Sequence, residues 1–184
     1  PGHGDTSVDS HLNLPVVNKT AAELSKMEWV PFKAAIDAGA DAVMVAHILF
    51  PKIDPDAPAS FSKVIIGQQL RGKLGFHGVV ITDSMAMGAI AKNYAIEDAS
   101  VRSVEAGSDI ILVSFGYETV KKIEQALLAS VKSGRIPESR IDESVTRILT
   151  LKRKYGLSDR ALAVPQIKGL NAEIRSWRKA VGVD

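Results

Sequence analysis

Cysteine is absent from this chain of 184 residues. Disulfide bonds and thiolate metal sites are therefore excluded. The absence does not distinguish a cytosolic protein from a cell-wall protein, because bacterial exported proteins often lack cysteine as well. The compartment consequently stays open.

Two further absences narrow the function classes. No apolar run approaches the roughly 18 residues that a membrane-spanning helix needs, so we expect no membrane span. Neither sign of charge is in excess, because 23 Lys and Arg residues stand against 21 Asp and Glu residues. The net charge of +2 gives no basic field for nucleic acid, and we expect no nucleic-acid partner. The sequence templates of nucleotide-binding loops and of serine hydrolases are missing too.

A helix-to-strand pattern occurs three times along the chain. Each copy passes from an apolar-periodic stretch, through a glycine, into a run rich in β-branched residues that ends at a polar residue. The runs span 43–46, 79–81 and 110–113, and the glycines before them are Gly39, Gly75 and Gly107. A glycine suits the left-handed position that closes a helix, where a side chain is penalised.

The three runs do not alternate polar with apolar residues, so we expect both faces of each strand to be buried, as in parallel sheets covered by helices. The strands begin roughly 30 to 35 residues apart, which fits a (β/α) barrel or a doubly wound sheet. We therefore predict an α/β fold in which parallel strands alternate with helices. Two more helices are expected at 119–133 and 137–155. The tail from residue 158 onward is expected either to cover the barrel or to lead towards a further domain, and Trp177 indicates that it docks somewhere.

Polar side chains stand where the predicted strands end. His47, Asp83 and Ser114 follow the three runs, at the end of a parallel sheet where active sites form. A carboxylate such as Asp83 is costly to bury unless neighbours bind it or a function keeps it there. It could instead cap the following helix, and His47 could be a hydrogen-bonded core residue. His77 precedes its strand, so we interpret it as a surface histidine.

The first eleven residues form a second candidate site. His3, Asp5, Asp9 and His11 lie in a segment that is too rich in small polar residues for a helix or strand. In the Asp9-x-His11 spacing, the carboxylate can reach the imidazole, fix its tautomer and raise its basicity. The alternative is an ordinary turn in which the Asp side chain bonds to the backbone. All four residues are metal-ligand types, but their spacing matches no metal motif, and we predict no metal and no cofactor.

Three segments together resemble the bacterial β-N-acetylglucosaminidases of glycoside hydrolase family 3. They are the loop from Pro1 to His11 with Leu14-Pro15, the pair Ala46-His47 with Phe50-Pro51, and the run from Leu74 to Gly88. The resemblance covers residues 1–157 and implies a TIM-like (β/α)8 barrel, of which this chain holds the C-terminal half.

By this resemblance, Asp83 is the catalytic nucleophile and the Asp9/His11 pair is the general acid/base. The implied activity is retaining hydrolysis that removes terminal β-linked N-acetylglucosamine through a covalent glycosyl-enzyme. The implied substrates are carbohydrates, either peptidoglycan fragments (muropeptides) or chitooligosaccharides. Histidine suits the acid/base role because an imidazole titrates near neutral pH. The substrate-binding residues stay unassigned.

The missing first half of the barrel is the main departure from the family pattern. We expect three or four of the eight strands in this chain, a number that cannot close a barrel. The N-terminal half-barrel is therefore an expected partner, either as a separate chain or as missing upstream sequence, and the isolated chain is expected to lack full activity. We assign residues 1–157 to the partial catalytic barrel and 158–184 to a tail or the start of a linker.

Three other functions would use the same residues differently. A phosphorylase would pass the glycosyl group to phosphate, which a histidine repels less than a glutamate would. A family 3 β-glucosidase would not need the Asp9-x-His11 loop. A half-barrel without catalysis would serve as a binding or assembly module, although the intact Asp9, His11 and Asp83 argue against a decayed site.

Overall fold

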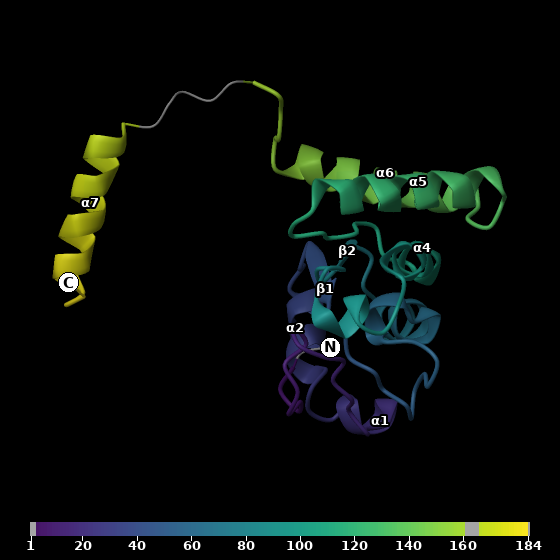
Figure 1. Ribbon diagram of the computed structural model, residues 1–184. Helices are drawn as coiled ribbons and strands as arrows, with labels where there is room; N and C mark the ends of the chain where they lie inside the picture. The colour runs from purple at the N-terminus through teal and green to yellow at the C-terminus, as the bar shows by residue number, and fades with distance from the viewer. Residues whose placement is uncertain (1–2, 161–165, 184) are drawn as a thin grey trace.

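The computed structural model describes residues 3–160 and 166–183. Helices and short parallel strands alternate along the chain, in agreement with the predicted α/β class (Figure 1). In chain order the elements are α1 (Ala21–Leu24), α2 (Val30–Asp37), β1 (Ala42–Val45), the 3₁₀ helix η1 (Ala59–Phe61), the π-helix η2 (Val64–Lys73), β2 (Val79–Thr82), α3 (Gly88–Ala91), α4 (Ile96–Ala106), α5 (Tyr117–Lys132), α6 (Glu138–Lys154) and α7 (Ile167–Ala180).

Strands β1 and β2 pair in parallel, with Ala42 opposite Val79. Each strand is preceded by a helix and by a glycine with a positive φ angle, +87° at Gly39 and +72° at Gly75. Gly107, with a φ angle of +119°, ends α4 in the same way. The helix ends predicted at these three glycines are therefore confirmed, and a strand follows the first two. Other residues would be strained in this left-handed region.

The third predicted strand, 110–113, is wrong as a regular strand. Its bridging within the described residues is limited to one parallel bridge between Ile81 and Ile110. The amide of Leu112 donates at 3.1 Å to the side-chain Oγ1 of Thr82 instead of to a backbone carbonyl. The described residues therefore hold two paired strands, fewer than the three or four expected, because a side chain replaces part of the ladder at segment 110–113.

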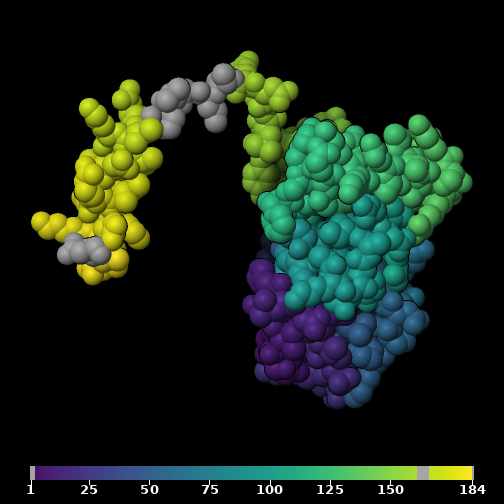
Figure 2. Space-filling view, viewed as in Figure 1, coloured from purple at the N-terminus to yellow at the C-terminus, as the bar shows by residue number. Residues whose placement is uncertain are grey.

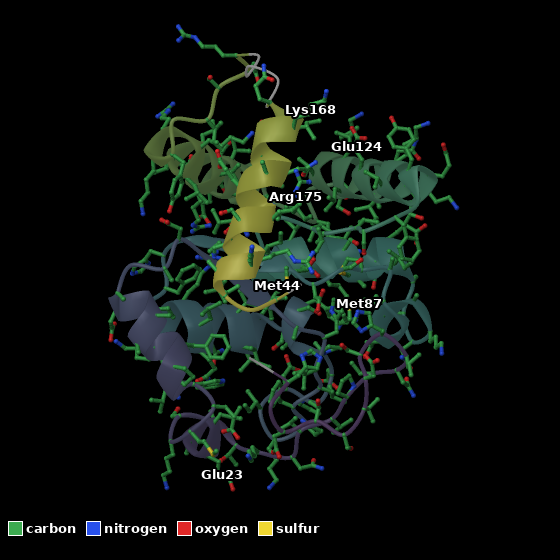
Figure 3. All side chains as sticks on the ribbon, turned by 90° about the vertical axis from the view of Figure 1, so that its left-hand side faces the viewer. Glu23, Met44, Met87, Glu124, Lys168 and Arg175 are labelled. Carbon is green, nitrogen blue, oxygen red and sulfur yellow. The ribbon has the colours of Figure 1, made fainter. Side chains whose placement is uncertain are left out.

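The two faces of β1 differ in burial. Val45 is 1% exposed, whereas Met44, on the opposite face of the strand, is 47% exposed (Figure 3 labels Met44). In β2, by contrast, Val79 and Val80 point to opposite faces and both are buried. The expectation that both faces are buried is confirmed for β2 and wrong for β1, because α2 and η2 supply packing on one side of β1 only.

The main hydrophobic core lies between the sheet and the helices α2 and η2. Its largest fully buried side chains are those of Leu24, Ile48, Phe50, Ile66 and Phe76. Burying one such side chain completely contributes about 1.5–3 kcal/mol. This cluster therefore fixes the strands whose ends carry the candidate site residues.

Asp109 joins the edge of the sheet to α6, and its side chain is 0% exposed. Its Oδ2 accepts hydrogen bonds from Arg71 at 2.8 Å and from the amide of Val80 at 2.9 Å. Its Oδ1 accepts from the hydroxyl of Ser144 at 2.7 Å and from Arg147 at 3.0 Å. Burial alone would raise the pKa of Asp109, but the hydrogen bonds from Val80 and Ser144 and the neighbouring arginine charges hold it below its usual value. The buried charge is thus fully paired.

Helices α5 and α6 confirm the two helices predicted after the third strand. Of the two expectations for the tail, covering the described part of the barrel is not what the structure shows (Figure 1). Every described side chain of α7 is exposed, Trp177 to 64%, and α7 lies apart from the packed body in Figures 1 and 2. Its apolar side chains therefore meet no partner surface within the described ranges. No helix in those ranges is long and apolar enough to cross a bilayer.

Candidate active site

Asp83 follows β2 directly, at the carboxyl end of the strand. Its backbone amide donates to the carbonyl of Val45 at 3.1 Å, so the residue still lies against β1. Its Oδ1 accepts a hydrogen bond from the amide of Ser84 at 2.7 Å. The alternative role as a helix cap is wrong, because the residue that caps α3 is Met87. The carboxylate of Asp83 is partly exposed and has no structural duty in ending or starting a helix.

Asp9 and His11 form the predicted hydrogen-bonded pair. The Oδ1 atom of Asp9 lies 2.8 Å from Nδ1 of His11 and accepts a second hydrogen bond, at 2.9 Å, from the backbone amide of His11. These bonds, the backbone one first, lower the pKa of Asp9. A carboxylate only accepts hydrogen bonds, so Nδ1 carries the proton of this bond and Nε2 is the ring nitrogen that lies outside it.

The loop that carries this pair is docked on the start of α3. The amide of Gly88 donates to the carbonyl of His11 at 3.1 Å, and the amide of Ala89 donates to the carbonyl of Ser10 at 3.0 Å. Helix α3 begins five residues after Asp83 and is joined to it by a tight turn. The two segments predicted separately from the sequence therefore meet at the same end of the sheet.

The side chains of the pair remain open to solvent. That of His11 is 75% exposed and that of Asp9 is 58% exposed. Ser10, between them, is buried, and its hydroxyl bonds to Nε2 of His3 at 2.8 Å. The loop is thus anchored through its middle while the acid and the imidazole face outward, an arrangement that admits a large ligand.

His47 could be either a site residue or a hydrogen-bonded core residue from its position in the sequence, and the structure shows it buried and hydrogen-bonded. It is 0% exposed, and its ring nitrogens bond to the hydroxyl of Ser60 at 2.7 Å and to the carbonyl of Ser84 at 3.0 Å. Ser114 donates from its amide to the hydroxyl of Ser84 at 3.1 Å. His77 is exposed at the opposite end of β2, as predicted.

Lys19 anchors the loop through a contact that the sequence does not reveal. Its Nζ lies 2.9 Å from Oδ2 of Asp5 and also bonds to the carboxylate of Glu28. The bond with Asp5 raises the pKa of Lys19 most, and the bond with Glu28 raises it further. The three residues are far apart in the sequence and no motif joins them, so only the folded chain shows that they meet.

Four potential metal ligands lie in the loop, and each of them contacts another protein side chain. His3 bonds to Ser10, Asp5 to Lys19, and Asp9 to His11. Within the two described ranges, no three His, Cys, Asp or Glu side chains are grouped to hold a metal ion.

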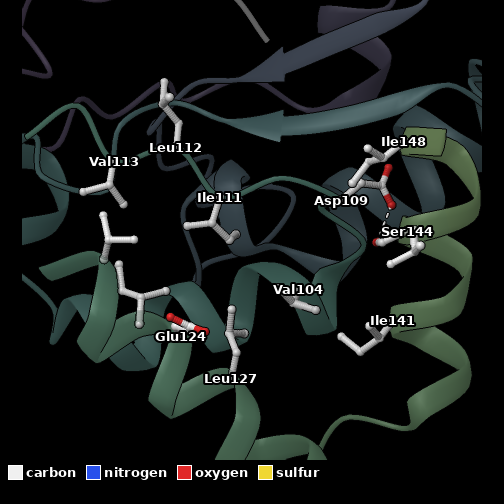
Figure 4. Close-up of a pocket in the computed structure, with 13 residues that line it drawn as sticks. Val104, Asp109, Ile111, Leu112, Val113, Glu124, Leu127, Ile141, Ser144 and Ile148 are labelled. Carbon is white, nitrogen blue, oxygen red and sulfur yellow. Dashed lines mark hydrogen bonds between the residues drawn. The ribbon is translucent and has the colours of Figure 1, made fainter. Parts of the chain in front are cut away.

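A large cleft among the described residues lies away from these groups. It has a volume of about 560 Å³ and is lined mainly by apolar side chains of α4, segment 109–113, α5 and α6, including Ile111, Leu127 and Ile141 (Figure 4). None of Asp9, His11 and Asp83 lines it. Its titratable side chains are Glu124 and Asp109, and Asp109 is already paired with Arg71 and Arg147. The strand ends and the loop therefore remain the better candidate site.

Comparisons with known proteins agree with one another. Residues 1–151 match the glycosyl hydrolase family 3 N-terminal domain. β-Hexosaminidase A of Pseudoalteromonas piscicida is 31% identical over 199 residues, covering 95% of this chain and 33% of that protein. A family 3 β-N-acetylglucosaminidase from Paenibacillus sp. str. FPU-7 has a similar structure, with a TM-score of 0.85 and 48% identity over 90% of this chain and 32% of that chain.

A structure of a β-glucoside phosphorylase is also similar. Its TM-score is 0.80 at 30% identity, covering 91% of this chain and 31% of that chain. The chain thus spans about a third of the length of each of these three proteins.

Proposed function

This chain belongs to glycosyl hydrolase family 3, and from that membership we propose that its protein is a retaining glycosidase that releases terminal β-linked N-acetylglucosamine. Its parallel strands and intervening helices are part of a TIM-barrel-like domain. The names of the relatives, a β-hexosaminidase and a β-N-acetylglucosaminidase, support this choice of sugar. The activity is assigned to the larger protein, because the chain spans only about a third of theirs.

The observation that carries the proposal is the docking of the Asp9/His11 loop beside the turn that follows Asp83. A retaining glycosidase needs one group that attacks the anomeric carbon and another that transfers a proton to and from oxygen. Asp83 supplies a carboxylate at the carboxyl end of β2, with one oxygen engaged by the Ser84 amide. His11, oriented by Asp9, supplies the imidazole.

In the first step, the carboxylate of Asp83 attacks the anomeric carbon and the glycosidic bond breaks. The leaving oxygen takes a proton from the imidazolium of His11, and a covalent glycosyl-enzyme forms on Asp83. In the second step, His11 takes a proton from water, whose oxygen attacks the same carbon and releases the Asp83 carboxylate. Two inversions give net retention at the anomeric carbon.

Asp9 supports both steps through its charge. The pKa of Asp9 is lowered, so this carboxylate stays ionised throughout the cycle. It stabilises the imidazolium that must protonate the leaving oxygen, and it holds the ring with Nδ1 toward the loop and Nε2 toward the substrate. The exposure of His11 would let a long glycan approach, which is consistent with muropeptides or chitooligosaccharides as substrates.

The catalytic unit includes more barrel than the described residues. Met44 exposes an apolar side chain on the face of β1 that helices do not cover, and segment 110–113 leaves its outer edge without a strand among the described residues. An uncovered sheet face and edge are unfavourable in water. We propose that residues 1–157 complete a barrel with an N-terminal half, and that residues 158–184 lead away from it.

Release of 4-nitrophenol from its β-N-acetylglucosaminide tests the proposal. The protein with its other barrel half is expected to turn this substrate over faster than the matching β-glucoside, and residues 1–184 alone are expected to be much less active. A higher rate on the glucoside would instead identify a β-glucosidase. Binding of N-acetylglucosamine by the two-half protein without turnover would favour a binding module.

Phosphorolysis is a second candidate because a β-glucoside phosphorylase has a similar structure. In that reaction phosphate replaces water in the second step, and the product is a sugar phosphate. A histidine in place of a second carboxylate repels the phosphate anion less. Analysis of the products with and without phosphate separates the two reactions. We expect free N-acetylglucosamine as the product under both conditions.

Gly88→Ala tests the docked position of the loop. A Cβ at residue 88 would stand 2.5 Å from the carbonyl oxygen of His11 and 2.7 Å from that of Leu12, and these backbone atoms cannot rotate away. We expect the loop to shift and turnover to fall by a factor on the order of 100, since a displacement of about 1 Å costs that much.

Gly67→Ala is the matched control for this substitution, because its Cβ would meet nothing within 4 Å. It is expected to keep the parent rate. Parent turnover in Gly88→Ala would show that the docked loop is not the active arrangement.

A further inference from the structure

His47 lies directly beneath the turn that carries Asp83, and its side chain is 0% exposed. One ring nitrogen, Nε2, lies 3.0 Å from the carbonyl oxygen of Ser84. The other, Nδ1, lies 2.7 Å from the hydroxyl of Ser60 on η1. The imidazole therefore bridges an element of the core and the residue next to the proposed nucleophile.

The two partners fix the protonation of the ring. A carbonyl oxygen only accepts, so Nε2 carries the proton and donates it to Ser84. The unprotonated Nδ1 then accepts the hydroxyl proton of Ser60. Burial lowers the pKa of His47, against the opposing effects of the Ser84 carbonyl and the nearby charge of Asp83, and keeps the ring neutral. A neutral, single-tautomer ring is a rigid donor and not a proton carrier.

Hydrogen bonds hold the peptide group before Asp83 and the second peptide group after it. Before it, the Asp83 amide donates to the carbonyl of Val45 at 3.1 Å. After it, the Ser84–Met85 peptide is bound at both ends, with the carbonyl accepting from His47 and the Met85 amide donating to Leu112 at 2.9 Å. Of these contacts, the one from His47 is made by a side chain, so it can be removed without cutting the backbone.

Core packing alone does not explain a histidine here. An apolar side chain of similar size would fill the same space without the cost of burying two polar nitrogens. Both ring nitrogens are instead hydrogen-bonded, and one of them binds the turn that positions the Asp83 carboxylate. A misplacement of about 1 Å in a reacting group can lower a rate on the order of 100-fold.

We propose that His47 is a positioning residue for glycosidic bond cleavage, which fixes the direction of the Asp83 carboxylate by holding the Ser84 carbonyl. The inference rests on the proposed function, since it needs Asp83 to be the nucleophile. His47 itself touches neither the substrate nor the reacting atoms.

The test compares His47→Leu, His47→Gln and Ser60→Ala in the whole protein. Initial rates are measured with β-N-acetylglucosaminides that carry a good or a poor leaving group, 2,4-dinitrophenol or 4-methylphenol. A misaimed nucleophile slows both substrates, so His47→Leu is expected to lower kcat on the order of 100-fold with each, with KM little changed. A lost general acid, as in His11→Ala, slows mainly the poor leaving group.

The conservative variant separates positioning from packing. A glutamine can place an N–H donor where Nε2 stands, so His47→Gln is expected to recover most of the rate. Ser60→Ala keeps the ring but frees Nδ1, and it is expected to lose part of the rate even if His47→Leu does not fold. His77→Leu, which changes an exposed histidine at the opposite end of β2, is the control and is expected to leave both rates unchanged.

Two results would overturn the inference. One is a folded His47→Leu protein with the parent kcat on both substrates. The other is a defect in His47→Leu and Ser60→Ala that is confined to the poor leaving group, which would place them with the acid and not with the nucleophile. A parent protein that turns over neither substrate would overturn the proposed function itself, and that result is visible before any variant is made.

Discussion

Replacing Asp83 with alanine is expected to lower turnover of the β-N-acetylglucosaminide by a factor on the order of 100 or more. The substitution removes the only group proposed to bond to the anomeric carbon, so no glycosyl-enzyme can form. The fold should tolerate the change, because the side chain is partly exposed and accepts one hydrogen bond, from Ser84. The measurement is the initial rate of 4-nitrophenol release by the whole protein.

Asp83→Asn is the matched control, since it keeps the size of the side chain and an acceptor for the Ser84 amide while removing the nucleophile. It is expected to be as inactive as Asp83→Ala. Added azide should restore part of the rate in Asp83→Ala by attacking from the vacated side, giving the α-azide. An unimpaired Asp83→Ala protein would leave the family membership intact but would refute the mechanism.

Asp109→Ala is expected to lower the free energy of unfolding by about 3–5 kcal/mol. The carboxylate is completely buried and binds Arg71 and Arg147. Removing it leaves partly buried guanidinium groups without their counter-charge and removes the link between the sheet edge and α6. The measurement is the urea midpoint of unfolding, with the slope of the transition checked for a change in cooperativity.

The control for this substitution is Asp98→Ala. Asp98 pairs with Arg135 at 3.2 Å, but their side chains are 53% and 43% exposed. Such a surface pair contributes about 0–1 kcal/mol. Equal losses of stability in the two variants would show that the buried cluster is no stronger than a surface ion pair.

The same cluster gives a direction for the effect of pH. The pKa of Asp109 is lowered in the folded protein, so the unfolded chain binds the proton more readily. The stabilisation is therefore complete above the unfolded pKa and is lost as the pH falls through the folded one. The difference in the free energy of unfolding between the parent and Asp109→Ala is accordingly expected to shrink as the pH falls.

The parts of the site that the sequence predicts are those set by local spacing. The Asp9/His11 hydrogen bond follows from two residues on the same loop, separated by one position. Asp83 is found because an apolar run that ends at a carboxylate marks the carboxyl end of a strand. The glycines that close the helices, such as Gly107, follow from the conformation they must adopt.

The parts that the sequence misses depend on partners distant in the chain. The prediction that both faces of β1 are buried is wrong, because a run of apolar residues does not indicate which faces a neighbour covers. The surface on which Trp177 docks cannot be predicted for the same reason, since an apolar residue does not identify its partner, and Trp177 is exposed in the structure. The link from Ser60 through His47 to Ser84 joins three segments that no sequence pattern relates.

The docking of the loop on α3 uses main-chain groups only, the amides of Gly88 and Ala89 and the carbonyls of His11 and Ser10. Such an attachment does not depend on the side chain at position 11. The identity of the proton donor and the place where it stands are therefore independent traits, and each can vary while the other is kept. A scaffold of this kind can exchange one acid for another, or adjust its basicity, without rebuilding the fold that presents it.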